Sequence, residues 1–400
     1  MKFLFAAFLY ATLFWMITWK RPGLALLSIF ALAPFQNDLS MAGPLRFSIA
    51  EVNLLLTLPV FVMQSRPFRL GPLAFPVAAY LACCLFSSAL QWRDTALVSL
   101  IQIAVYLVAA VVVFRSLPRR VEQYRASLFA LIAVCCVLAA FVLANQSGYV
   151  LGLHKNGAGG SLACGMIVCT ELWFAERDAV RKQWLLIALG IVACGLFFTL
   201  SRGAWITAVS GVGIILLLRR QFVMMLRASV LFAALATICW GRLPAEARNY
   251  ATGFERDNYN IMARYYSIDY AQGEFERNPF TGVGVGLRKE YDATNIILLT
   301  LAETGIPGLV TLLAIHVAFL RMAWRSRRYL KRSSPEASLV AIAAALVVGK
   351  MMHGTVDLYW GRGDLMLTWA AAGMAIRACA VCRPRKPPVT QPLLHPSLAA

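Results

Sequence analysis

Charged residues are scarce in this chain. They make up 14% of its 400 residues, whereas a soluble globular protein carries about 25%. Hydrophobic residues reach 60% and the mean hydropathy is +0.67. This balance excludes an ordinary soluble domain and predicts a polytopic membrane protein.

Acidic residues are scarcer than basic ones, with 19 Asp and Glu against 38 Lys and Arg and a net charge of +19. Such an excess can indicate a nucleic-acid partner. Here, however, the basic residues stand in short clusters between apolar tracts, which is the pattern of a membrane protein with a positive cytoplasmic side. We therefore expect membrane lipids, and no nucleic acid, around this chain.

Motifs for metals and nucleotides are also missing. Cys379 and Cys382 form a C-x-x-C with no second pair or histidine cluster, so we expect neither a metal nor a redox site. The run GVGVG at 282–286 lacks the G-x-G-x-x-G spacing and follows no predicted strand. No small-residue cleavage site follows the apolar stretch that ends at Trp19, so we expect an uncleaved span there. We predict no cofactor.

Apolar tracts near the ~20 residues that a helix needs to cross a membrane recur along the chain. They predict an all-α polytopic membrane protein with about 12–13 transmembrane helices and one long extracytoplasmic loop that contains short helices. The predicted spans lie near 3–19, 23–35, 48–63, 73–90, 95–114, 126–144, 158–175, 184–200, 203–218, 226–241, 295–323, 337–353 and 364–382.

The loops predict the orientation. Alternate loops hold 24 and 13 of the Lys and Arg residues, and the richer side should be cytoplasmic. The chain then divides into N-terminal helices, central helices with the HKN and SRG motifs, an extracytoplasmic loop, C-terminal helices and a basic, Pro-rich cytoplasmic tail: 1–144, 145–241, 242–293, 294–382 and 383–400.

Arg202 is the only charged residue between Trp184 and Leu218. Because this tract is too long for one span, we predict two helices joined at Ser201-Arg202-Gly203, with Gly203 permitting the turn. Arg202 then lies at the outer interface, since an arginine inside hydrocarbon is costly. It either anchors a helix end or contacts a ligand.

Other candidate residues fall on the same predicted outer face. A helix ending before Pro279 should carry Tyr259, Met262, Ala263, Tyr266 and Tyr270 on one face and Arg264, with Ile268, on another; the aromatic face favours an interfacial helix over a sugar platform. Gly305, Pro307 and Gly308 predict a break that leaves a stub over 295–303. His353 and Asp357 can meet if their helix continues through Gly354.

Five pieces in this order resemble the bacterial O-antigen ligase and O-antigen polymerase superfamily over roughly residues 150–325. They are HKNGAGG at 154–160, TLSRGAW at 199–205, Arg264, NPFTGVGVG at 278–286 and TNIILLTLAETGIPG at 294–308. The resemblance implies a glycosyltransferase at the outer face of the bacterial inner membrane. Its donor would be an undecaprenyl-diphosphate-linked glycan and its acceptor either lipid A core, for a ligase, or another repeat unit, for an O-antigen or exopolysaccharide polymerase. It also implies inversion at the sugar, with neither metal nor nucleotide sugar.

For this reaction the sequence contains candidate substrate-binding residues and candidate catalytic residues. Arginines suit a lipid diphosphate because guanidinium binds phosphate oxygens bidentately. The predicted substrate-binding residues are Arg202, Arg264, His154, Lys155, Asn156, Asn295 and Glu303.

The related ligases place histidine where this chain has Thr294, and threonine cannot act as a base near neutral pH. Either the protein is a polymerase relative that does not use that histidine, or Asp292, Glu303 or His353 replaces it, or the alignment shifts here. Asp292 and His353 are the predicted catalytic residues, and His316 should be a packed core histidine.

Two other classes of protein compete with this interpretation. A transporter or flippase would show paired broken helices in two related halves, but the sequence has no internal repeat and its candidate residues gather on one face. A non-catalytic component of a polysaccharide assembly system is the third interpretation.

Overall fold

The computed structural model describes residues 2–36, 47–64, 66–118, 120–242 and 259–382. Within these ranges the regular structure is helical, and the only β-type pairing is an isolated bridge between Val150 and Leu153. The predicted all-α fold is confirmed.

Every predicted span coincides with a helical segment. The elements are α1 (Lys2–Lys20), α2 (Pro22–Leu32), α3 (Ile49–Met63), η1 (Gly71–Leu73), α4 (Ala74–Leu90), α5 (Ala96–Ala104), η2 (Val105–Ala110), α6 (Val111–Ser116), α7 (Val121–Asn145), α8 (Lys155–Ala175), α9 (Ala179–Phe198), α10 (Arg202–Arg219), α11 (Phe222–Arg242), α13 (Tyr259–Arg277), α14 (Leu287–Glu290), α15 (Ile296–Ser326), α16 (Pro335–Gly354) and α17 (Arg362–Cys382). In the described part of the chain, nine helical segments are long and apolar enough to cross a membrane. The protein is therefore a multi-pass membrane protein.

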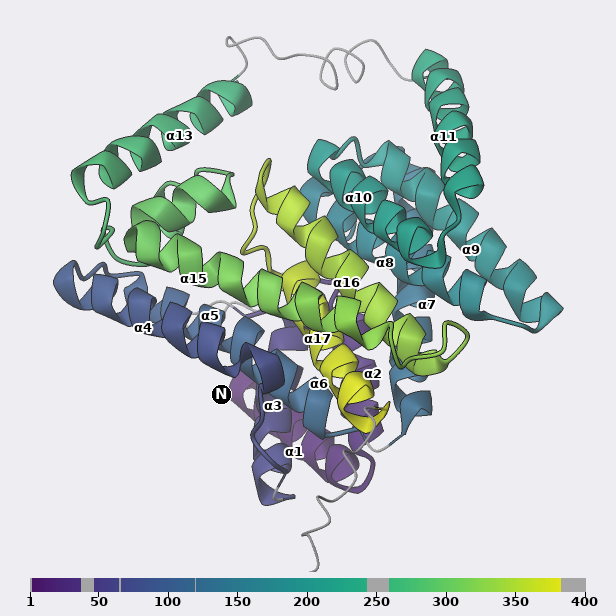
Figure 1. The fold of residues 1–400 in the computed structure, drawn as a ribbon, viewed down its shortest axis with the longest axis horizontal. Helices are drawn as coiled ribbons and strands as arrows, with labels where there is room; N and C mark the ends of the chain where they lie inside the picture. The colour runs from purple at the N-terminus through teal and green to yellow at the C-terminus, as the bar shows by residue number, and fades with distance from the viewer. Residues whose placement is uncertain (1, 37–46, 65, 119, 243–258, 383–400) are drawn as a thin grey trace, which may run out of the picture.

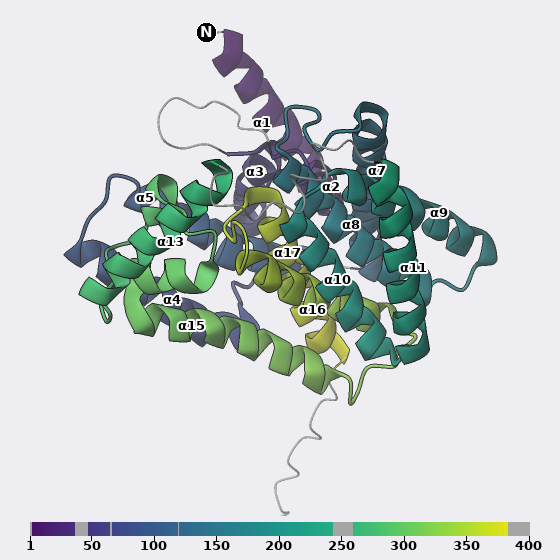
Figure 2. The same ribbon diagram turned by 90° about the horizontal axis from the view of Figure 1, so that it is seen from above.

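Helix α17 occupies the centre of the bundle. It packs against α16, α6, η2 and α8, and α16 in turn packs against α10 (Figures 1 and 2). In α8, α16 and α17, 78% of the span is buried within the protein, against 22% in α9. A helix buried on nearly all sides is apolar all round, so these three form the interior and α9 lies at the periphery.

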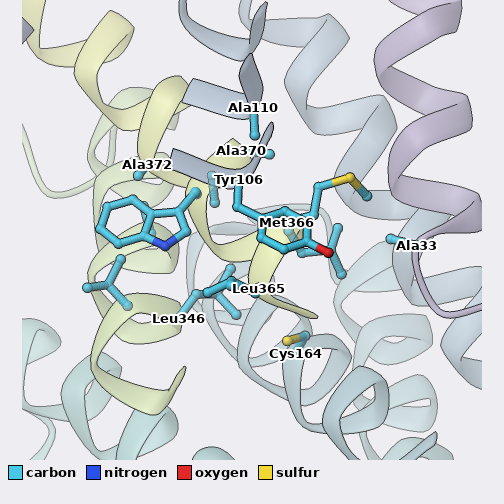
Figure 3. Close-up of a cluster of buried hydrophobic side chains, with 14 of the residues drawn as sticks. Ala33, Tyr106, Ala110, Cys164, Leu346, Leu365, Met366, Ala370 and Ala372 are labelled. Carbon is cyan, nitrogen blue, oxygen red and sulfur yellow. The ribbon is translucent and has the colours of Figure 1, made fainter. Parts of the chain in front are cut away.

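The core between these helices combines large and small side chains. Tyr106 of η2, Met366 of α17, Cys164 of α8 and Leu346 of α16 belong to one buried cluster, which also includes alanines such as Ala110 and Ala370 (Figure 3). Small residues let membrane helices approach closely. The Tyr106 hydroxyl donates a hydrogen bond to Glu51 of α3, which gives a buried polar group the partner that it requires.

The long helix α15 is interrupted at Gly305, whose φ of 66° and ψ of −170° are not helical. The predicted break is confirmed. The segment after α13 fills the gap, because the Ile306 N–H donates to the Pro279 carbonyl at 2.8 Å and the Val283 N–H to the Ala302 carbonyl at 2.9 Å. A Cβ atom at Gly305 would lie 2.6 Å from the Phe280 carbonyl group, so only glycine fits this position.

Candidate functional site

A cavity of about 390 Å³ lies where α8, α10 and α15 begin, next to α13 and to the loop that follows α16. Five of the nine predicted site residues line it: Lys155, Asn156, Arg202, Arg264 and Asn295. Thr294 and Asp357 line it as well. Segments as far apart in the sequence as Lys155 and Asp357 thus contribute to one site, as expected for functional residues held by a helical scaffold.

Three helix N-termini meet at this cavity. Lys155 is the first residue of α8, Arg202 is the first residue of α10, and Asn295 is the N-cap of α15. A helix N-terminus carries a partial positive charge and N–H groups without intrahelical partners. Together with the side chains of Lys155, Arg202 and Arg264, this arrangement suits an anion.

The start of α10 differs from the other two because Ser201, its N-cap residue, makes no side-chain capping bond. The Ser201 hydroxyl instead donates to Oδ1 of Asn156 at 3.1 Å. A serine in this position normally accepts a hydrogen bond from the first turn. Ser201 therefore does not cap the first turn of α10, and Arg202 and Gly203 of that turn line the cavity.

The turn between α9 and α10 forms where it was predicted, but by another residue. Leu200 takes the left-handed conformation, with φ of 51°, whereas Gly203 is already helical. The expectation that Gly203 makes the turn is wrong. Gly203 is required for a close approach, because a Cβ atom there would lie 2.8 Å from both Cδ2 and Nε2 of the His353 ring.

His353 lies directly behind the cavity wall and is 3% exposed. Its Nε2 is 3.8 Å from Oδ2 of Asp357 and its Nδ1 is 3.8 Å from Oδ2 of Asp364. Neither ring nitrogen has a hydrogen-bond partner within the described ranges. Nζ of Lys350 lies 2.9 Å from the same Oδ2 of Asp364, so a row of ionisable groups leads inward from the cavity.

Asp357 forms the cavity end of this row. The backbone turns once more after α16, with the Asp357 N–H donating to the His353 carbonyl at 2.9 Å, and this confirms the predicted meeting of the two residues. Burial would raise the pKa of Asp357, but His353, the Leu358 N–H at 2.8 Å and Arg264 outweigh it and hold the pKa below its ordinary value. Asp357 is therefore ionised at neutral pH.

Helix α13 presents Arg264 to the cavity together with Tyr265 and Ile268. Arg264 donates from Nη1 to the Val356 carbonyl at 3.1 Å, and its Nη2 lies 3.8 Å from Oδ2 of Asp357. The aromatic face points elsewhere, since the Tyr270 and Tyr266 rings lie 4.5 and 5.9 Å from the ring of Tyr291. The predicted separation of the two faces is confirmed.

Besides His353, three predicted site residues do not line the cavity. Two of them, His154 and Asp292, make local contacts beside it. His154 is the N-cap of α8, with Nδ1 accepting from the Asn156 N–H at 3.3 Å and Nε2 3.1 Å from the Tyr149 hydroxyl. Asp292 accepts the Thr294 N–H at 2.9 Å and so supports the left-handed conformation of Thr294, whose φ is 49°. Burial raises the pKa of Asp292 to about 6.

Glu303 is the third residue outside the cavity, and it is 1% exposed. Its Oε1 accepts the N–H groups of Gly286 at 2.9 Å and Arg288 at 3.2 Å, and its Oε2 lies 3.8 Å from Nη1 of Arg288. Glu303 therefore fastens the GVGVG segment to the stub of α15. His316 is also buried and bonds to the Leu312 carbonyl and the Tyr359 hydroxyl, as predicted for a core histidine.

No group of three or more His, Cys, Asp or Glu residues in the described part of the chain could hold a metal ion.

Asn295 lines the cavity but also caps α15, since its Oδ1 accepts from the N–H groups of Ile297 and Leu298. Its Nδ2 donates to the Thr355 carbonyl at 3.3 Å. The amide thus joins the start of α15 to the loop that carries Asp357.

Residues 185–313 match the family model described as O-antigen ligase. This segment of the chain is therefore similar to O-antigen ligases. The matched segment includes Arg202, Arg264 and Asn295 at the cavity, and the resemblance to the O-antigen ligase and polymerase superfamily is confirmed. No curated protein matches the chain. The similarity to O-antigen ligases and the membrane helices together indicate a membrane protein that handles glycans.

Proposed function

We propose that this protein is a membrane glycosyltransferase that takes a glycan from a polyprenyl-diphosphate carrier and joins it to an acceptor sugar. The meeting of three helix N-termini with Arg202, Arg264 and Lys155 at one cavity carries the proposal. A diphosphate is the part of such a donor that needs fixed positive charge. In the related reactions the carrier is undecaprenyl diphosphate and the site faces outward from the bacterial inner membrane.

The diphosphate lies against the start of α10 in this proposal. Arg202 and Arg264 bind its oxygens with their paired N–H groups, and the first-turn N–H groups of α10 donate hydrogen bonds to the remaining oxygens. Positive groups already in place where charge develops lower the barrier more than groups that must be reorganised. The site therefore stabilises the leaving diphosphate as the bond to the sugar breaks.

We propose that Asp357 is the general base that receives the proton of the acceptor hydroxyl. It is the only acidic side chain among the described residues that line the cavity. The hydroxyl oxygen forms a bond to the anomeric carbon, the bond from that carbon to the diphosphate oxygen breaks, and its electron pair leaves on the diphosphate. The proton moves to Asp357, with His353 behind it as the next group in the row.

This assignment moves the base away from position 294. Thr294 lines the cavity but cannot take a proton near neutral pH, and Asp292 does not line it. A chain without the imidazole that ligases place there fits a polymerase that joins one lipid-linked repeat to another. Lipid A core is the acceptor in the competing proposal.

Purified protein in vesicles with a defined polyprenyl-diphosphate glycan tests the proposal directly. We expect polyprenyl diphosphate to be released together with a longer glycan when a second lipid-linked repeat is the acceptor. Extension on lipid A core alone would make the protein a ligase. If neither acceptor supports release of the carrier while the donor remains intact, the proposed activity is wrong.

A further inference from the structure

A second cavity, of about 650 Å³, lies at the opposite ends of the same helices. The C-terminal ends of α10 and α15 and the N-terminal part of α16 surround it, and Figure 2 shows the end of α15 beside the lower ends of α10 and α11. Its walls are apolar and include Leu217, Leu320, Trp324, Val340 and Ala344.

Arginines surround the mouth of this cavity. Arg219, Arg220, Arg327, Arg328 and Arg332 line it, whereas Glu171 is the only acidic side chain among its described lining residues. Glu171 already binds Arg219 through both carboxylate oxygens. The remaining arginines therefore leave a positive charge that the lining carboxylate does not balance.

The contacts of Arg327 also favour the binding of an anion at the mouth of the second cavity. Arg327 lies over the ring of Trp324, with Cζ 4.5 Å from the ring centre, which holds the guanidinium at the mouth. Partial burial and the neighbouring cations of Arg332 and Arg220 lower the pKa of Arg327. Mutual repulsion of this kind is relieved when an anion binds among the arginines.

The cavity opens toward the surface that lipid covers. Leu217, Phe222 and Trp324 line it and are nevertheless 46%, 56% and 61% exposed. Exposed apolar side chains on membrane helices face acyl chains, and an opening between them admits a chain sideways. The basic residues at this end also belong to the loops that the charge bias assigns to the cytoplasmic side.

We propose that this second cavity binds an anionic phospholipid of the cytoplasmic leaflet. The headgroup phosphate lies among Arg220, Arg328 and Arg332, and one acyl chain follows the apolar walls between α10, α15 and α16. Basic sites between membrane helices attract anionic headgroups. A free phosphate would leave the apolar walls unused, so a lipid fits the cavity better. The proposal does not depend on the activity at the first cavity.

The test is retention of lipid through detergent purification, measured by native mass spectrometry, together with thermal stability after lipid is added back. We expect phosphatidylglycerol to be retained and to raise the melting temperature, and phosphatidylcholine to do neither. The double variant Arg220→Gln with Arg328→Gln should bind phosphatidylglycerol at least ~10-fold more weakly, because it loses two charged hydrogen bonds.

The control is Arg177→Gln with Arg181→Gln, two exposed arginines before and in the first turn of α9. They lie on the same predicted side of the membrane but do not line the cavity. This control should bind phosphatidylglycerol as the wild type does. Equal retention of both lipids, equal losses in the two double variants, or stabilisation by inorganic phosphate equal to that by phosphatidylglycerol would overturn the proposal.

Discussion

The hydroxyl of Ser201 donates a hydrogen bond to Oδ1 of Asn156 across 3.1 Å, and this contact joins the SRG motif of α10 to the HKN motif of α8. The Ser201 hydroxyl therefore does not cap α10, whose first residues Arg202 and Gly203 line the cavity. We expect Asn156→Ala to free the Ser201 hydroxyl, which can then cap α10 in place of the ligand. Transfer should fall about fivefold, which corresponds to the ~1 kcal/mol worth of one such hydrogen bond.

Ser201→Ala supplies the comparison for that variant. It also breaks the bond to Asn156 but offers no hydroxyl to cap α10, so its loss of transfer should be smaller than that of Asn156→Ala. Initial rates from reconstituted protein at equal amounts of folded enzyme measure both. A larger loss in Ser201→Ala would show that the serine itself contacts the substrate.

Gly203→Ala tests the close packing of α10 on His353. The added Cβ atom would lie 2.8 Å from the imidazole, so we expect the ring to shift away from Asp357 and transfer to fall at least ~10-fold, with a stability loss of about 1–3 kcal/mol from overpacking. Gly213→Ala is the matched control in the same helix, because no heavy atom lies within 4 Å of the place that its added Cβ atom would take. That control should be active and slightly more stable, since alanine favours the helix. Equal activity in both variants would remove His353 from the mechanism.

Asp357→Asn and Asp292→Asn separate the two candidate bases. Asp357→Asn should cut transfer at least ~100-fold, within the range that a general base contributes. Asp292→Asn should have less than about a threefold effect, because an asparagine oxygen can still accept the Thr294 N–H and hold the turn. The opposite order of effects would place the base at Asp292, the residue that sequence reasoning favoured.

The raised pKa of Asp292 also predicts a pH dependence of stability. Its pKa is about 6 in the folded protein and 3.8 in the unfolded reference, so the folded state binds the proton more tightly. The stability contributed by this carboxyl group is present below about pH 4 and is lost as the pH rises to about 6. In melting curves between pH 4 and 7, Asp292→Asn should remove this part of the decline. The exposed Asp269→Asn should leave the curve unchanged, and identical curves for all three proteins would contradict the assignment.

Variants of Glu303 can distinguish a structural role of this residue from a role in substrate binding. Glu303→Gln keeps an oxygen for the Gly286 and Arg288 N–H groups but loses the charge opposite Arg288, whereas Glu303→Ala loses both. Breaking a buried ion pair costs about 3–5 kcal/mol. We expect both variants to melt earlier, Glu303→Ala more so, with transfer by the folded Glu303→Gln protein close to wild type. Normal melting with lost transfer would make Glu303 a substrate contact.

Much of this arrangement follows from local sequence signals. Helix ends follow from the alternation of apolar and polar tracts, and the break at Gly305 follows from glycine and proline spacing. The left-handed residue at Leu200 could not be predicted, because glycine is the usual choice and Gly203 stands nearby. That Asp357 lines the cavity while Asp292 does not depends on how α13, α15 and α16 pack. No spacing within one segment contains that information.

The orientation of the chain is a separate prediction. In a background without native cysteines, Ser267→Cys on α13 and Ser333→Cys in the loop between α15 and α16 can be labelled on intact spheroplasts with a membrane-impermeant thiol reagent. The charge bias predicts labelling at 267 and protection at 333 until the membrane is opened. The reverse pattern would turn both cavities around, so that the first would face the cytoplasm.

The most direct test of the diphosphate site is the rate at which reconstituted Arg202→Lys releases polyprenyl diphosphate from a defined lipid-linked glycan. Lysine keeps the charge but loses the paired N–H geometry of the guanidinium, and a charged hydrogen bond is worth about 1.5–3 kcal/mol. We predict a fall of about 10- to 100-fold for Arg202→Lys and at least as much for Arg202→Ala, with the exposed Arg181→Ala unchanged. Release at the wild-type rate by Arg202→Ala would show that the arginine only anchors its helix, and would contradict the account.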